Sequence, residues 1–143
     1  MKQKTIYRNY ISLKLLTLDI MHEVSLVRTI SATLEAEFPK EELSRLTEIS
    51  LRVGVLSNVQ PILMQNAFAA VQEGEGKFKD VRLQIEVLPV RVRCEVCTHE
   101  SEIHNYKFAC ANCGKPTSNV IQGNELLIHK VEFADPITSP AAG

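Results

Sequence analysis

The stretch Glu48-Ile-Ser-Leu-Arg-Val-Gly-Val55 alternates polar and apolar side chains with a period of two. This period is typical of a strand with one buried face. A second alternating run covers residues 81–87. The segment between them has a helical apolar pattern, with Pro61 suited to its first turn and Gly74 and Gly76 at its end. The order strand, helix, strand predicts two parallel strands joined by a right-handed crossover.

The flanking segments extend this unit in both directions. Upstream, apolar residues spaced three or four positions apart predict an amphipathic helix from about Met21 to Phe38, which Pro39 ends. Downstream, Leu126–Phe133 predicts a last strand that returns to the same sheet. We therefore expect an α+β fold: a small mixed three-stranded sheet with two helices, plus an inserted zinc-ribbon module.

The expected organisation has four parts. Residues 1–20 form an N-terminal extension, 21–90 and 123–135 an α+β domain, 91–122 the zinc ribbon and 136–143 a loose tail. The extension has no strong helix or strand signal, and Met21 is itself a potential initiator. We favour a working protein that begins at Met21; the alternative is that the extension is retained.

The cysteines lie in one short segment that carries the clearest chemistry. Cys94-Glu-Val-Cys97 and Cys110-Ala-Asn-Cys113 are two CxxC pairs separated by twelve residues. A two-residue gap lets both sulfurs of one tight turn face the same ion, and four thiolates complete the tetrahedral coordination that zinc prefers. Such a site has no open position, so we expect its role to be structural.

Other functions of the four cysteines are less well supported by the sequence. A redox CxxC is normally single, and disulfides are typical of secreted chains. An iron–sulfur or rubredoxin-like iron site uses the same ligands and stays open as an alternative. We expect His99 and His104 to be exposed polar residues, with weak extra metal ligation as the alternative. His129, in the predicted last strand, is expected to be packed or half-exposed.

Composition narrows the class of protein. The chain has 143 residues, of which 45% are hydrophobic and 23% charged, and its formal net charge is -1. These values suit one compact domain with a small appendage and argue against a disordered chain or a membrane-surface protein. No apolar run approaches the ~18 residues of a membrane span. The opening residues imitate a signal peptide poorly, because Lys14 interrupts their short apolar stretch. We expect a cytoplasmic protein whose thiols stay reduced.

Several segments together resemble the HypA/HybF family, the nickel metallochaperones of hydrogenase maturation. The first is Met21-His22-Glu23-Val24-Ser25-Leu26, and the second is Arg52-Val53-Gly54-Val55-Leu56-Ser57. The double CxxC and the run Gly123-Asn124-Glu125-Leu126-Leu127-Ile128 follow in the same order. The resemblance extends from Met21 to Phe133, so it covers nearly the whole chain apart from the extension and the tail.

The resemblance implies two metal sites. The four cysteines match the family's zinc ligands, His22 matches its nickel-binding histidine, and Glu23 matches the acidic residue beside it. Nickel(II) accepts square-planar nitrogen ligation, which an imidazole and its neighbouring main-chain nitrogens can supply. A chain that begins at Met21 would add a free amine to this set.

The resemblance also implies a role. It is that of a carrier without turnover of its own, which works with a nickel-linked maturation GTPase and the hydrogenase large subunit as a monomer or weak dimer. The competing reading is a zinc-ribbon module for nucleic acid or protein. Basic residues near the cysteines are interleaved with Glu95, Glu100 and Glu102, so no basic stripe forms. A metal-dependent hydrolase ranks last, because four cysteines leave no open zinc position.

Overall fold

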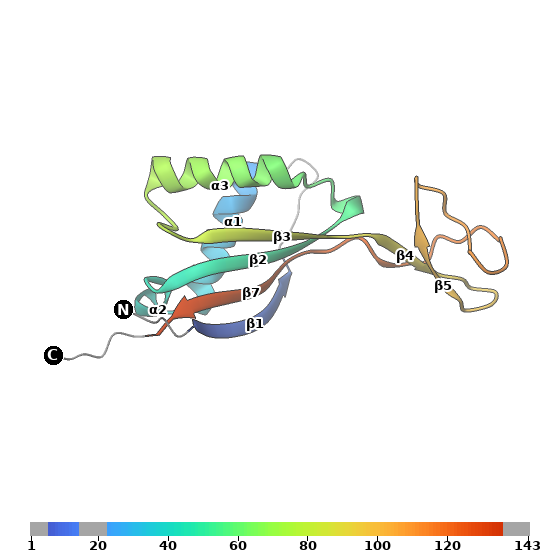
Figure 1. Cartoon of the computed structure of the whole chain (residues 1–143), viewed down its shortest axis with the longest axis horizontal. Helices are drawn as coiled ribbons and strands as arrows, with labels where there is room; N and C mark the ends of the chain where they lie inside the picture. Colours follow the sequence, from blue (N-terminus) through green and yellow to red (C-terminus); the bar gives the residue numbers. More distant parts are fainter. Residues whose placement is uncertain (1–5, 15–22, 136–143) are drawn as a thin grey trace.

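The computed structural model describes residues 6–14 and 23–135. Its strands form two sheets, which lie one beyond the other along the long axis of the molecule (Figure 1). The body sheet has the order β1 (Ile6–Lys14), β7 (Leu126–Ala134), β2 (Leu46–Gly54), β3 (Arg82–Leu88). The second sheet has the order β5 (Glu100–Ile103), β4 (Val90–Arg93), β6 (Val120–Gln122). We call the segment from Val90 to Gln122, which carries the second sheet and the cysteines, the metal module.

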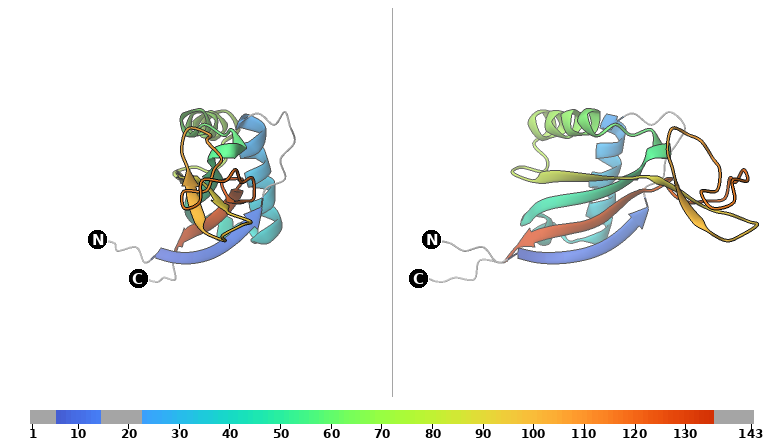
Figure 2. Two further views of the ribbon diagram at one scale, coloured as in Figure 1. Left: turned by 90° about the vertical axis from the view of Figure 1, so that its right-hand side faces the viewer. Right: turned by 45° about the vertical axis from the view of Figure 1, so that its right-hand side comes forward.

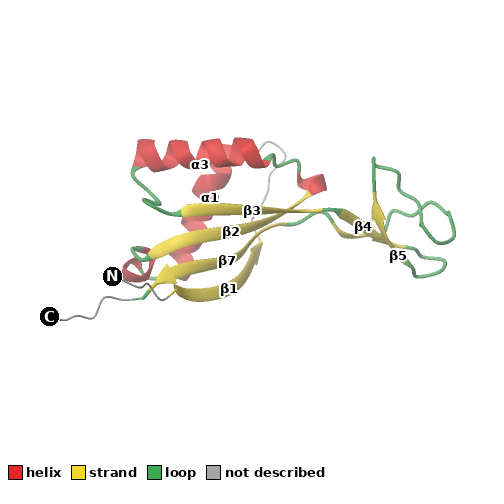
Figure 3. Ribbon diagram, in the orientation of Figure 1, coloured by secondary structure: helices red, strands yellow, loops and turns green. Residues whose placement is uncertain are grey.

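The helices cover one face of the body sheet (Figures 2 and 3). They are α1 (Glu23–Glu37), the short α2 (Lys40–Leu43) and α3 (Pro61–Glu75), with a 3-10 turn η1 (Val55–Ser57) after β2. The β2 strand pairs parallel with β3 and antiparallel with β7, so the sheet is mixed, as predicted. The predicted α+β class with an inserted four-cysteine module is confirmed.

Sequence signals account for both long helices. In α1, apolar side chains at the predicted spacing are buried, among them Leu26, Ile30 and Leu34. In α3, Pro61 stands in the first turn, and Gly76 ends the helix in the left-handed conformation with φ 66°. The two buried faces pack on the inward side chains of β2, β3 and β7 to form one apolar core. Within residues 6–14 and 23–135, no helix is long and apolar enough to cross a membrane.

The body sheet contains one strand more than expected. Ile6–Lys14 pairs antiparallel with β7, from Ile6 opposite Ala134 to Lys14 opposite Leu127. The expectation that residues 1–20 carry no strand is therefore wrong for this segment. The segment is rich in Ile and Tyr, which favour strands, but it lacks a clean alternation. The second edge of β7 decides the pairing, because an unpaired strand edge recruits another strand through its backbone.

Body and metal module meet where the chain crosses itself at two glycines. The backbone N–H of Gly54 donates to the carbonyl of Glu125 at 2.7 Å, and that of Leu56 donates to the carbonyl of Gly123 at 2.9 Å. A Cβ at Gly54 would lie 2.0 Å from the backbone carbon and oxygen of Gly123. Only glycine permits this approach, and we call the crossing the glycine joint.

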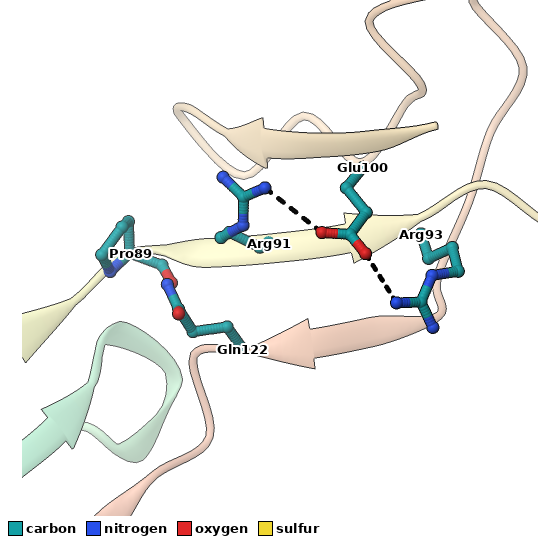
Figure 4. A network of polar contacts seen from close by, with 5 residues as sticks. All are labelled: Pro89, Arg91, Arg93, Glu100 and Gln122. Carbon is teal, nitrogen blue, oxygen red and sulfur yellow. Dashed lines mark hydrogen bonds and ion pairs between the residues drawn. The ribbon is translucent and has the colours of Figure 1, made fainter. Parts of the chain in front are cut away.

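Two further contacts fix the joint. The side chain of Leu56 packs against the apolar cluster of the metal module. The side-chain amide of Gln122 donates to the carbonyl of Pro89 at 3.0 Å, which ties the two connecting strands to each other (Figure 4). Pro89 follows the last residue of the edge strand β3, where a missing N–H costs no ladder hydrogen bond, as predicted.

The joint predicts a large cost for Gly54→Ala. The added methyl group must push two backbones apart, so we expect a loss of about 3 kcal/mol or more in the free energy of unfolding. The matched control is Gly74→Ala in α3, where a Cβ meets nothing within 4 Å; it should stabilise the protein by up to about 1 kcal/mol. Urea denaturation measures both. Equal midpoints for the two variants would contradict the close approach at the joint.

Candidate metal centre

The first cysteine pair lies in the turn that joins β4 to β5. The backbone N–H of Cys94 donates to the carbonyl of His99, and the N–H of Thr98 donates back to the carbonyl of Cys94, each at 2.9 Å. Thr98 adopts the left-handed conformation with φ 64°. This tight turn places Cys97 on the same side as Cys94, as the two-residue spacing predicts.

The second pair repeats this turn at identical offsets. The N–H of Cys110 donates to the carbonyl of Lys115, and the N–H of Gly114 donates to the carbonyl of Cys110, each at 2.9 Å. Gly114 takes the left-handed position, with φ 78°. An isolated bridge between Ala109 and Pro116 closes the second turn. Each cysteine pair therefore lies in its own hairpin turn.

The two turns bring all four sulfurs together. The Sγ atoms lie within 4.8 Å of one another, with 3.7 Å between Cys94 and Cys113 and 3.6 Å between Cys97 and Cys110. A tetrahedral zinc with bonds of about 2.3 Å to sulfur has sulfur–sulfur edges of about 3.8 Å. The donor set and its dimensions therefore suit a closed site for a metal such as zinc.

Backbone donors favour thiolates on the two leading cysteines. The N–H groups of Cys113 and Asn112 each lie 3.4 Å from the Cys110 sulfur and lower the pKa of that thiol to about 6, against the effect of burial. At Cys94 the N–H groups of Cys97 and Val96 lower the pKa of the thiol in the same way. Because metals bind the thiolate form, these turns prepare two of the ligands.

The Cys113 thiol has the opposite tendency. The N–H of Lys115 lowers its pKa, but burial and the neighbouring thiols outweigh that donor and raise the pKa to about 11. Three nearby sulfurs make a further negative charge unfavourable, and a cation among them would relieve that repulsion.

Asn112 also contacts the sulfur cluster, although no role for it was predicted from the sequence. The side-chain amide of Asn112 lies 3.6 Å from the Cys97 sulfur, so the second turn reaches across to the first. The equivalent position of the first turn is Val96, which is 66% exposed and offers no donor. The signal was available: a polar residue inside a CxxC gap is placed to hydrogen-bond a thiolate.

The rest of the module has a small core. Val90, Val92 and Ile103 are buried, and Phe108 packs against them. Phe108 is therefore a packing residue, whereas Tyr106 is 65% exposed with a left-handed backbone. With so few buried apolar residues, the module needs a further source of stability, which four metal–sulfur bonds would supply.

Charges on the module are balanced rather than basic. Glu100 accepts from Arg93 at 2.6 Å and lies 3.4 Å from Arg91, so one carboxylate serves both guanidinium groups (Figure 4). These contacts lower the pKa of the Glu100 carboxyl, chiefly through the hydrogen bond from Arg93. Of the interleaved charges noted in the sequence, Glu100 thus pairs with both arginines of β4, which leaves β4 without the free basic groups that a nucleic-acid backbone needs.

The described histidines lie outside the cluster of four sulfurs. His99 and His104 are exposed, and His104 Nε2 lies 3.8 Å from the carboxylate of Glu102. His129 is half-buried in β7, as predicted, and its pKa is lowered first by burial and then by the nearby charges of Arg52 and Lys130. Within the described residues, the four cysteines are the group of His, Cys, Asp or Glu residues that could hold a metal.

Of the two predicted nickel ligands, only Glu23 lies within the described residues. His22 lies outside the described residues. Glu23 is the first residue of α1 and is half-buried. A carboxylate at this position interacts favourably with the positive end of the helix dipole. The assignment of nickel to these two residues stays a prediction.

Fold and site together define a class of protein: a small α+β body that carries a four-thiolate metal module on two connecting strands. A sequence model of the family described as hydrogenase/urease nickel incorporation metallochaperone, HypA, matches residues 21–133. The chain belongs to the HypA family.

Individual relatives agree with this family. The hydrogenase maturation factor HypA of Desulfitobacterium hafniense strain DCB-2 is 35% identical over 118 residues, which cover 80% of this chain and all of that protein. The protein of the same description from Moorella thermoacetica is 32% identical over 108 residues, 76% of this chain and 95% of the relative.

Solved structures share the fold. The solution structure of the Ni metallochaperone HypA from Helicobacter pylori has 26% sequence identity and a TM-score of 0.53, covering 80% of this chain and 100% of that one. A second solution structure of a HypA protein has 25% identity and a TM-score of 0.58, covering 80% of this chain and 97% of that one.

Because the two turns are equivalent, exchanging the residues at their left-handed positions should change metal retention in opposite directions. A β-branched residue with positive φ costs about 1–2 kcal/mol, so Thr98→Gly should preserve or strengthen metal retention. Gly114→Thr should weaken it, although a Cβ there meets nothing within 4 Å. The measurement is the rate at which a chelator removes the metal from each variant. If both variants release the metal equally fast, the backbone strain at positions 98 and 114 does not affect metal retention.

Proposed function

We propose that this chain is a nickel metallochaperone that binds nickel near His22 and delivers it to the large subunit of a [NiFe] hydrogenase, while four cysteines hold zinc structurally. The observation that carries the proposal is the family match over residues 21–133, whose first residues are Met21-His22-Glu23. This is where the family resemblance puts the nickel-binding histidine.

The chemistry of the proposed nickel site supports a cargo role. Imidazole and main-chain nitrogens suit square-planar nickel(II), and they come from adjacent residues in one short segment. Such a site needs little of the fold to form, so nickel can leave it without unfolding the body. Glu23, at the start of α1, would add a carboxylate beside the ion.

The zinc role rests on different residues. The ion would be held by Cys94, Cys97, Cys110 and Cys113. It would cross-link the two turns and would have no open coordination position for a reaction. The backbone donors around Cys110 and Cys94 and the amide of Asn112 would keep the thiolates oriented. On this basis the chain has no catalytic residues, and we propose that it is not an enzyme.

The family also suggests where and with what the chain works. We propose a nickel-linked maturation GTPase and the hydrogenase large subunit as partners, a cytoplasmic site of action, no nucleic acid or membrane partner, and a monomer or weak dimer. The end of α1 that begins at Glu23 would be the docking surface for the GTPase, because the proposed nickel site adjoins it. Free thiols at all four cysteines suit a reducing compartment.

Metal analysis of three proteins tests the proposal. The unmodified chain should contain one zinc and bind one added nickel. His22→Ala should reduce nickel affinity by about tenfold or more, which corresponds to about 1.4 kcal/mol or more, and should leave zinc unchanged. The matched control, His104→Ala, removes an exposed imidazole whose side chain is 75% exposed, and should change neither metal.

Two outcomes would contradict the two-site arrangement. Loss of zinc from His22→Ala would mean that the sites are not separate. Unchanged nickel affinity in that variant would mean that His22 is not a ligand. Comparing chains that begin at Met1 and at Met21 then tests the amine: tighter nickel binding by the shorter chain would assign the terminal nitrogen to the ligand set.

A further inference from the structure

A cavity lies between α1, α2 and the loop that joins α3 to β3. The short helix α2 and this loop are at the end of the body furthest from the metal module (Figure 1). Its volume is about 540 Å³, within the range of small-molecule sites, about 300–1,000 Å³. The walls are apolar side chains: buried Leu34, Leu46 and Val81, and partly buried Phe38 and Phe78. The interior can therefore receive an apolar group.

The polar lining of this cavity is mainly cationic. Lys40, Lys77 and Lys79 line it, against a single carboxylate, Glu35. Lys77 Nζ lies 3.6 Å from Glu35 and 3.4 Å from the hydroxyl of Ser31, so it is held beside α1. Neither Lys40 nor Lys79 forms an ion pair with a carboxylate in the described part of the chain. The cavity thus carries two cations that no described carboxylate neutralises, and we call it the lysine-rimmed cavity.

The loop that contributes two of these lysines is held by specific contacts. Gly76, Phe78 and Asp80 are all left-handed, with φ between 57° and 66°. The ring of Phe78 stacks on Phe68 with 5.1 Å between centroids, and the amide of Gln72 donates to the Phe78 carbonyl at 2.8 Å. These contacts hold a backbone that is unfavourable for two non-glycine residues, and they keep the backbone of Lys77 and Lys79 at the cavity.

We propose that the lysine-rimmed cavity binds a small organic anion with an apolar body, of the class of medium-chain carboxylates. The apolar walls would take the chain, and Lys40, Lys77 and Lys79 would face the carboxylate. Net positive lining selects an anion over a neutral lipid or an amine, and the volume suits a small molecule. This site is independent of the metals, since its lining includes neither the cysteines nor Glu23.

Titration of the zinc-loaded full chain with sodium octanoate, followed by ¹H–¹⁵N NMR below the micelle-forming concentration, tests the proposal. Saturable shifts should appear in residues 31–46 and 76–81 and leave the metal module unchanged. Octanol should bind about tenfold more weakly or worse, because it lacks the charge-assisted contacts. Lys79→Gln and Lys40→Gln should each weaken octanoate binding several-fold, and the matched control Lys107→Gln, on the metal module, should not.

Several results would overturn the proposal. These are the absence of saturable shifts at the cavity, octanol binding as tightly as octanoate, or equal affinity in the lysine variants and the control. Shifts of the same residues on simple dilution would identify a second copy of the chain as the occupant.

Discussion

The close approach of Gly54 to Gly123 is the constraint on which the arrangement of the molecule depends. A side chain on Gly54 would overlap the backbone of Gly123, and hydrogen bonds from Gly54 and Leu56 hold the crossing closed. Leu56 at the same time contributes its side chain to the apolar cluster of the metal module. One turn after β2 therefore belongs to both halves of the protein, and it connects the module to the end of the sheet without a free linker.

The two halves are stabilised in different ways. The body has a continuous apolar core in which α1 and α3 pack on three strands, so burial of apolar surface can support it alone. The metal module has three buried apolar residues besides its cysteines and the contribution from Leu56. Its two turns place four sulfurs within 4.8 Å of one another, an arrangement that repels itself once the thiols ionise. A bound cation removes this repulsion and joins the turns, so we expect the module's stability to depend on metal far more than that of the body.

Much of this could be predicted from the sequence, because the informative residues act locally. The alternation in β2 and the spacing of Leu26, Ile30 and Leu34 each determine an element with one buried face. Each CxxC pair determines a tight turn. What could not be predicted depends on distant partners. The pairing of Ile6–Lys14 is decided by the edge of β7, and the lysine-rimmed cavity joins residues of α1 with the loop after α3. The contact of Asn112 with Cys97 likewise arises only when the two turns meet.

We propose that the protein keeps two chemically different metal sites apart, and X-ray absorption on protein loaded with both metals tests this arrangement. We expect a zinc edge with four sulfur neighbours at about 2.3 Å, unchanged when nickel is added, and a nickel edge with only nitrogen and oxygen neighbours. Sulfur in the nickel shell, or a zinc shell with fewer than four sulfurs, would contradict it.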